Sequence, residues 1–128
     1  MSKYPIEIKA NLEQTLTNLQ AAKEFLEAGQ YEAAASRAAE AAFHTGATLL
    51  LDEEIEASKH GDVITLIQEI FVNGRRLTKE QGANLSWLFA MRNAENRGTS
   101  SHVTPEEAQR AVGIAESFFE AAKVILQG

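Results

Sequence analysis

Cysteine is absent from the 128-residue sequence, which excludes disulfide frameworks, thiol nucleophiles and cysteine-based zinc sites. Two prolines and eight glycines interrupt a composition that is 45% hydrophobic, as in a folded globular chain. No run approaches the roughly 20 apolar residues that a membrane-spanning helix needs. The first ten residues, MSKYPIEIKA, lack the apolar stretch of a signal peptide. We therefore expect a soluble, cytoplasmic protein that does not associate with a membrane.

Positive charge is in short supply. The chain has 18 acidic and 12 basic residues, giving a net charge of -6. Such a surface repels nucleic acid at long range, so any nucleotide or RNA binding would depend on a local basic patch. The length favours a single domain, and we expect residues 1–128 to form one.

The patterns of several catalytic and cofactor sites are missing as well. No two histidines lie one helical turn apart and no Glu-x-x-His pair occurs, so metal ligation has little support. The glycine patterns of Rossmann and Walker phosphate loops are absent, and no nucleophile-elbow motif is present. We expect no metal site and no cofactor.

What the sequence does contain is helical periodicity. Apolar residues recur three or four apart throughout, and no window shows the alternation of a strand. The pattern predicts helices over 6–28, 31–52, 63–72, 79–96 and from 105 onward. Four long helices and one short helix with brief connections indicate an all-α, up-and-down helical bundle of about five helices.

Capping residues mark three of the helix starts. Asp62 is a candidate N-cap for the short third helix. Thr78 with Gln81, and Thr104 with Glu107, form the pattern of a capping box, in which each end supplies a hydrogen bond to the other. We expect the fourth and fifth helices to begin directly after these two threonines.

Polar residues form a stripe on the alanine-rich second helix. Ser36, Arg37, Glu40 and His44 are spaced so that they share a face. An intrahelical ion pair between Arg37 and Glu40 would be an ordinary surface feature of small energy. The histidine next to Phe43 is more typical of a packed or surface residue than of a catalyst. Arg37 and His44 are nevertheless candidate ligand-binding residues.

A second polar group, RNAENRGTSSH, occupies residues 92–102. Arg92 and Asn96 are further candidate ligand-binding residues, although an ion pair between Arg92 and Glu95 would again be merely structural. Arg97 and His102 are candidate catalytic residues. A metal-independent ribonuclease needs an imidazole to move the 2′-hydroxyl proton and a cation to stabilise charge on the phosphorus.

The order of these segments resembles the HEPN superfamily (higher eukaryotes and prokaryotes nucleotide-binding), in particular its small stand-alone prokaryotic branch. The resemblance runs from about Leu19 to Leu126. It rests on four segments, which are SRAAEAAFH at 36–44, KHGDVITLIQEIFVNGRRL at 59–77, RNAENRG at 92–98 and TPEEAQRAVGIAESFFEAAKVIL at 104–126. The histidine of the second segment, His60, reads as a loop residue.

Departures from the family pattern affect the expected site. The two tyrosines that the family often carries on the second helix are replaced by Ala39 and Glu40. Ribonuclease members of the superfamily carry Arg, four to six residues, then His. The family arginine corresponds to Arg92, and residues 97–99, where that histidine would fall, are Arg97, Gly98 and Thr99. The resemblance therefore implies that the ribonuclease motif is absent in its usual register.

Three functions stay open. The leading hypothesis is a non-catalytic HEPN-type protein that binds a nucleotide, RNA or a protein partner. By resemblance, that partner is a small nucleotidyltransferase, as in toxin–antitoxin pairs. The second is a metal-independent RNA endonuclease toxin that uses Arg97 and His102, or Arg92 with another histidine. The third is a pure protein-interaction scaffold.

Self-association is expected from the apolar content of the helix faces. Trp87, Leu88 and Phe89 follow one another on the predicted fourth helix, which is more apolar surface than a four-helix core obviously needs. Exposed apolar patches mark contact surfaces. We expect a homodimer with two-fold symmetry.

Overall fold

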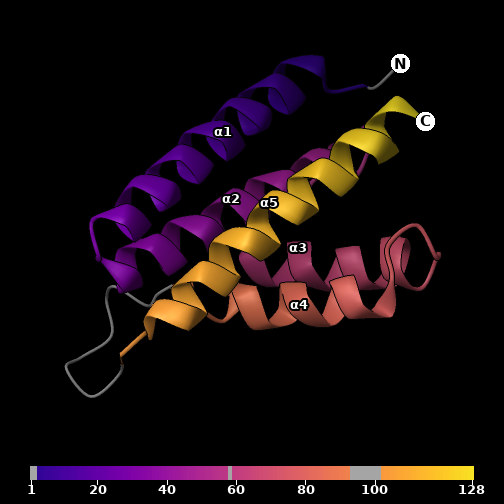
Figure 1. Cartoon of the computed structure of the whole chain (residues 1–128). Helices are drawn as coiled ribbons and strands as arrows, with labels where there is room; N and C mark the ends of the chain where they lie inside the picture. The colour runs from indigo at the N-terminus through magenta and orange to yellow at the C-terminus, as the bar shows by residue number, and fades with distance from the viewer. Residues whose placement is uncertain (1–2, 58, 93–101) are drawn as a thin grey trace.

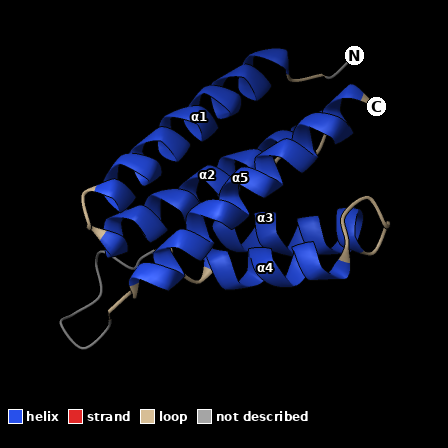
Figure 2. Ribbon diagram, viewed as in Figure 1, coloured by secondary structure: helices blue, strands red, loops and turns tan. Residues whose placement is uncertain are grey.

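The computed structural model describes residues 3–57, 59–92 and 102–128, and these residues form α-helices, one π-helical segment and no strand. The helices are α1 (Pro5–Glu27), α2 (Tyr31–Asp52), α3 (His60–Leu66), η1 (Ile67–Val72), α4 (Lys79–Phe89) and α5 (Pro105–Gln127). The predicted all-α bundle is confirmed (Figure 2).

The helices are arranged around α2. In Figure 1, α1 and α2 form an antiparallel pair, α5 lies along α2, and the hairpin of α3 and α4 covers the remaining side. The N-terminal end of α1 and the C-terminal end of α5 lie at the same end of the bundle. The part of the chain that folds into these helices includes none with both the length and the apolar character needed to span a lipid bilayer.

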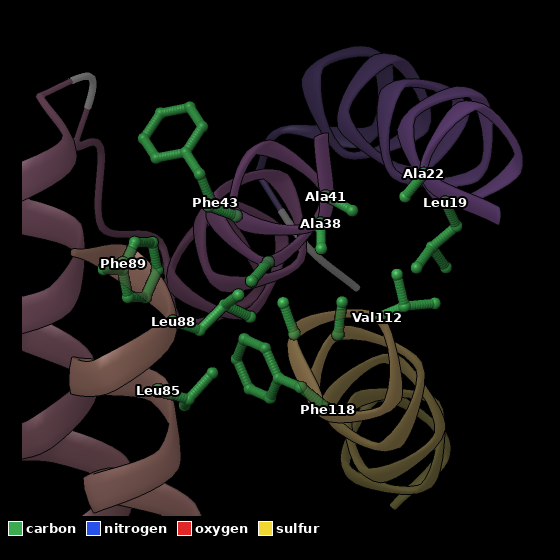
Figure 3. Close-up of a cluster of buried hydrophobic side chains, with 14 of the residues drawn as sticks. Leu19, Ala22, Ala38, Ala41, Phe43, Leu85, Leu88, Phe89, Val112 and Phe118 are labelled. Carbon is green, nitrogen blue, oxygen red and sulfur yellow. The ribbon is translucent and has the colours of Figure 1, made fainter. Parts of the chain in front are cut away.

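Alanine explains the central position of α2. Alanine favours the helix, and its small side chain lets neighbouring helices approach closely from several directions. Six alanines of α2 are completely buried: Ala34, Ala35, Ala38, Ala39, Ala41 and Ala42. Larger side chains from the surrounding helices fill the space that these alanines leave. Figure 3 shows Leu19 of α1 and Leu88 of α4 in the cluster around Ala38 and Ala41, with the Phe118 ring of α5 beside Leu88.

Two of the three predicted helix starts are confirmed. At Thr78 and at Thr104, the hydroxyl accepts from the backbone N–H three residues later, at 3.0 Å in each case. The Gln81 and Glu107 side chains accept in return from the two cap N–H groups, at 2.7 Å and 3.0 Å. Both capping boxes satisfy donors that a helix N-terminus leaves without an intrahelical partner.

The third predicted start is wrong. α3 begins at His60 with Lys59 as its N-cap residue, so Asp62 lies within the first turn. There its carboxylate interacts favourably with the positive end of the helix dipole, but Asp62 is not the N-cap residue. The end predicted for the fourth helix is also too late, because α4 stops at Phe89. The backbone N–H groups of Met91 and Arg92 bond to carbonyls three residues earlier, as in a tightened turn.

The π-helical turns of η1 were not predicted, and they meet α4 at a close contact. Gln68 donates to the Gly82 carbonyl at 2.8 Å and to the Ser86 hydroxyl at 3.2 Å. A Cβ atom at Gly82 would lie 2.7 Å from Gln68 Oε1 and 2.9 Å from Val72 Cγ2. Glycine at this position is therefore what lets α4 lie against η1.

The apolar triplet on α4 does not form the exposed patch that was expected. Leu88 and Phe89 belong to the monomer core, and Trp87 is half-buried against its edge. The large apolar side chains that are exposed lie instead on α1 and α5. Ile6 is 79% exposed, Leu16 54% and Val124 69%.

Candidate functional site

The chain leaving α4 is anchored on the N-terminal half of α2. Ser36 is buried, and its hydroxyl donates to the backbone carbonyl of Arg92. A serine at this position therefore satisfies a carbonyl that lies beyond the end of α4. The bond connects residues 56 positions apart and brings the Arg92 backbone against α2.

Two arginines flank this anchor in the sequence. Arg37 follows Ser36 directly and is exposed, and Arg92 is half-buried. Neither guanidinium forms an ion pair with a carboxylate among the described residues. The expected Arg37–Glu40 pair is therefore not formed. Glu95, the other expected partner of Arg92, lies outside the described residues.

Glu40 binds a histidine instead. His60 Nε2 lies 3.0 Å from Glu40 Oε1, and the imidazole stacks on the Phe43 ring with centroids 3.8 Å apart and planes 15° apart. His60 thus joins the start of α3 to α2, and the expectation of a loop histidine is wrong. Glu40 and Phe43 are three positions apart on one helix, which indicates a place where an imidazole could bind. The sequence does not show which histidine reaches it.

His44 takes part in the contact between α1 and α2. Its Nδ1 lies 2.7 Å from the Asn11 side-chain oxygen. Because that oxygen is an acceptor, Nδ1 carries the proton in the neutral ring. Burial lowers the pKa of His44 below its ordinary 6.5. The neighbouring Glu40 carboxylate raises this pKa by less than burial lowers it, and the nearby His60 lowers it further.

His44 is also distant from the arginines. It follows Ser36 by eight residues, which is about 12 Å along a helix. Of the predicted ligand-binding residues, Arg92 has its backbone bonded to Ser36, next to Arg37, and His44 lies in a different contact.

His102 lies near the N-terminal end of α2. Its Nδ1 is 3.7 Å from Glu32 Oε1, and its side chain is 75% exposed. Two predicted residues, Asn96 and Arg97, lie outside the described residues. Among the residues that the structure describes, no group of three or more histidine, aspartate or glutamate side chains could hold a metal ion.

Two arginines thus occupy neighbouring stretches of the chain. Arg37 is on α2, and the backbone of Arg92, beyond the end of α4, is bonded to the preceding Ser36. Guanidinium groups match the paired oxygens of phosphate and carboxylate. His102 and Glu32 lie toward the same end of α2, about one turn before Ser36.

Comparison with known proteins covers nearly the whole chain. The HEPN domain model matches residues 8–125. A protein of Methanocaldococcus jannaschii that carries the name "Putative toxin MJ0605" is 34% identical. The match covers 94% of this chain and 90% of that protein.

Proposed function

The chain belongs to the HEPN domain family, and on that premise we propose a non-catalytic binding protein in which residues 1–128 form one domain. Its ligand is a phosphate group of a nucleotide or of RNA. The observation that carries this proposal is the Ser36–Arg92 hydrogen bond. It holds the Arg92 backbone next to Ser36, the residue before Arg37. Neither arginine forms an ion pair with a carboxylate of the residues that the structure describes.

The overall charge is consistent with a local mode of binding. With a net charge of -6, the protein does not attract RNA as a whole. Any affinity has to come from the two arginines themselves, through charge-assisted hydrogen bonds to phosphate oxygens. We expect such binding to weaken steeply with added salt.

The positions of the histidines support a non-catalytic role. General acid–base catalysis needs an imidazole within hydrogen-bond reach of the proton that it moves. His60 is bonded to Glu40 and stacked on Phe43, and His44 is bonded to Asn11. His102 is the remaining candidate, and it follows Arg92 by ten residues rather than by the five to seven of the family motif.

The test uses Arg92→Ala in thermal scans with and without ATP. If Arg92 binds the phosphate, ATP raises the melting temperature of the wild type and this rise shrinks in the variant, while the melting temperature without ATP barely changes. Lys79→Ala, an exposed cation at the start of α4, is the matched control. A pure protein-interaction scaffold would give no ATP response in any of the three proteins.

The second candidate is an RNA endonuclease toxin. The name of the archaeal relative favours it, and so does the contact between His102 and Glu32, since a carboxylate beside an imidazole orients it for proton transfer. Incubation of single-stranded RNA with wild type and His102→Ala distinguishes the two candidates. Fragments with 2′,3′-cyclic phosphate ends that disappear in the variant would replace the binding proposal with the ribonuclease.

We also propose that the protein forms a homodimer and pairs with a small nucleotidyltransferase of the toxin–antitoxin type. The support for a dimer is the exposed apolar surface of α1 and α5, where Ile6, Leu16 and Val124 lie. Light scattering at micromolar concentration tests it, because a particle of 14.0 kDa would be the monomer. The nucleotidyltransferase partner follows from the family alone, and co-purification of the two proteins tests it.

A further inference from the structure

A hollow lies between α4 and α5, distinct from the arginine pair beyond the end of α4. Its volume is about 290 Å³, close to the lower end of what small-molecule pockets occupy. Leu85 and Phe118 form its apolar base, and Figure 3 shows the Phe118 ring pointing from α5 toward Leu85 on α4. The hollow is therefore suited to a compact apolar group rather than to a helix.

Polar groups surround this apolar base. Asn84 on α4 and Ser117 on α5 line the hollow, together with Gln81 and Arg110. A few polar groups around an apolar base are the usual composition of a small-molecule site, since they fix the orientation of the ligand.

Arg110 supplies the charge at the rim. Its guanidinium lies over the Trp87 ring, 4.1 Å from the ring centroid, which restricts its position. No carboxylate of the described residues lies within ion-pair distance of it. A cation that is held in place and lacks a counter-charge favours an anionic ligand.

Gly113 keeps one wall of the hollow open. It lies in the interior of α5, where glycine is less favourable than any residue except proline. No atom lies within 4 Å of where its Cβ would be. Packing within the monomer therefore does not require glycine, whereas a larger side chain would project into the hollow that Gly113 lines.

We propose that this hollow binds a small carboxylate with an apolar body, the carboxylate pairing with Arg110 and the body resting on Leu85 and Phe118. The two oxygens of a carboxylate match the fork of a guanidinium. The volume limits the body to about the size of one aromatic ring and a short chain. The side-chain amide of Asn84 and the hydroxyl of Ser117 would bind the remaining carboxylate lone pairs.

The test uses 3-phenylpropionate as the probe and the fluorescence of Trp87, the sole tryptophan of the chain. We expect a saturable change in emission, because the guanidinium over the indole ring shifts when it binds the carboxylate. The neutral 3-phenylpropionamide should bind at least about tenfold more weakly, since it loses a charge-assisted hydrogen bond. Chemical shifts of backbone amides on α4 and α5 provide a second readout that does not depend on Trp87.

Four variants locate the site. Gly113→Leu should abolish binding and leave the melting temperature equal or higher, because leucine favours the helix. Gln109→Leu places the same side chain on an exposed position of α5 outside the hollow and should bind the probe like the wild type. Arg110→Gln should lose the preference for the carboxylate over the amide, and Arg110→Lys should restore part of it.

Several results would overturn this inference. They are the lack of any saturable response, equal binding of acid and amide by the wild type, and undiminished binding by a folded Gly113→Leu variant. If the wild type self-associates but does not bind the probe, and Gly113→Leu no longer self-associates, the hollow would be assigned to a second copy of the chain instead.

Discussion

Two polar stretches of α2 differ in how far the bundle satisfies them. In residues 44–48, His44 bonds to Asn11, and the hydroxyls of Thr45 and Thr48 donate to carbonyls one turn earlier at 2.9 Å. Thr45 also lies 3.4 Å from the Thr15 hydroxyl of α1. In residues 36–40, Ser36 and Glu40 have protein partners, but Arg37 forms no described ion pair.

The difference separates polar groups that stabilise the fold from charged groups that could bind a ligand. Buried polar groups must find partners because an unsatisfied group costs free energy, and none of the buried polar side-chain atoms in the described residues lacks one. A solvated charge has no such requirement and remains free to bind a ligand. Changes in the 44–48 stretch should therefore affect stability, and changes at the arginines should affect ligand affinity.

The largest effect on stability is expected at Gly46. A Cβ there would lie 2.9 Å from Val63 Cγ1 and 3.4 Å from Ile67 Cγ1, so α3 and η1 would have to move. Gly46→Leu should lower the free energy of unfolding by about 1–3 kcal/mol, as overpacking does. Urea denaturation measures this. Gly61→Leu is the control, since no atom lies within 4 Å of that Cβ, and equal midpoints for the two variants would contradict the close contact.

A smaller effect is expected at the anchor of the site. Ser36→Ala removes the donor to the Arg92 carbonyl and should cost about 1 kcal/mol of stability. Because the same bond fixes the Arg92 backbone beside α2, this variant should also bind ATP more weakly than the wild type. Thr48→Ala, which loses a hydroxyl bond within α2, should lose stability but keep its ATP affinity. If both variants retain full affinity, Ser36 does not position the site.

The pH dependence of stability should report on His44. Its folded-state pKa lies below the ordinary 6.5, so the unfolded chain binds the proton more readily. This contribution to stability is complete above 6.5 and is lost as the pH falls through the folded-state pKa. Melting temperatures from about pH 8 down to about pH 5.5 bracket the ordinary histidine pKa and should fall on the acid side. The melting temperature of His44→Gln should fall less over the same pH range. If its profile were identical to that of the wild type, His44 would not contribute to the pH dependence.

The smallest effect on stability is expected at Arg37. Its side chain is exposed and forms no described ion pair, so Arg37→Ala should change the free energy of unfolding by less than about 0.5 kcal/mol. ATP affinity should nevertheless fall. Calorimetric titration with ATP checks this against Lys59→Ala, an exposed cation at the start of α3. Equal losses in both variants would indicate attraction by general charge alone.

Much of the fold follows from local sequence signals. The periodicity of apolar residues and the threonine capping boxes act within one helix, and the structure contains the helices that they predict. The predicted start of α3 was wrong because Asp62 resembles an N-cap residue. The helix begins two residues earlier, at His60, which packs on Phe43 and bonds to Glu40. The π-helical turns of η1 have no signal in the local pattern of apolar residues.

The candidate residues could be named from the sequence, but their arrangement could not. The arginines at 37 and 92 were identified from their positions on two helix faces. The hydrogen bond that holds the Arg92 backbone beside Ser36 is a tertiary contact between a side chain and a backbone carbonyl. The exposed apolar surface was assigned to the wrong helix, because three successive apolar residues on α4 cannot show which of them face the core.

The salt dependence of RNA affinity tests the central claim most directly. Binding of a labelled single-stranded RNA would be measured over a range of salt concentrations for the wild type and for the Arg37→Ala/Arg92→Ala double variant. For two phosphate contacts, the slope of log affinity against log salt should become shallower by about 1.4 in the variant, from about 0.7 per contact to a single strand. Equal slopes and affinities, or RNA that is cut by the wild type during the measurement, would contradict non-catalytic phosphate binding by these two arginines.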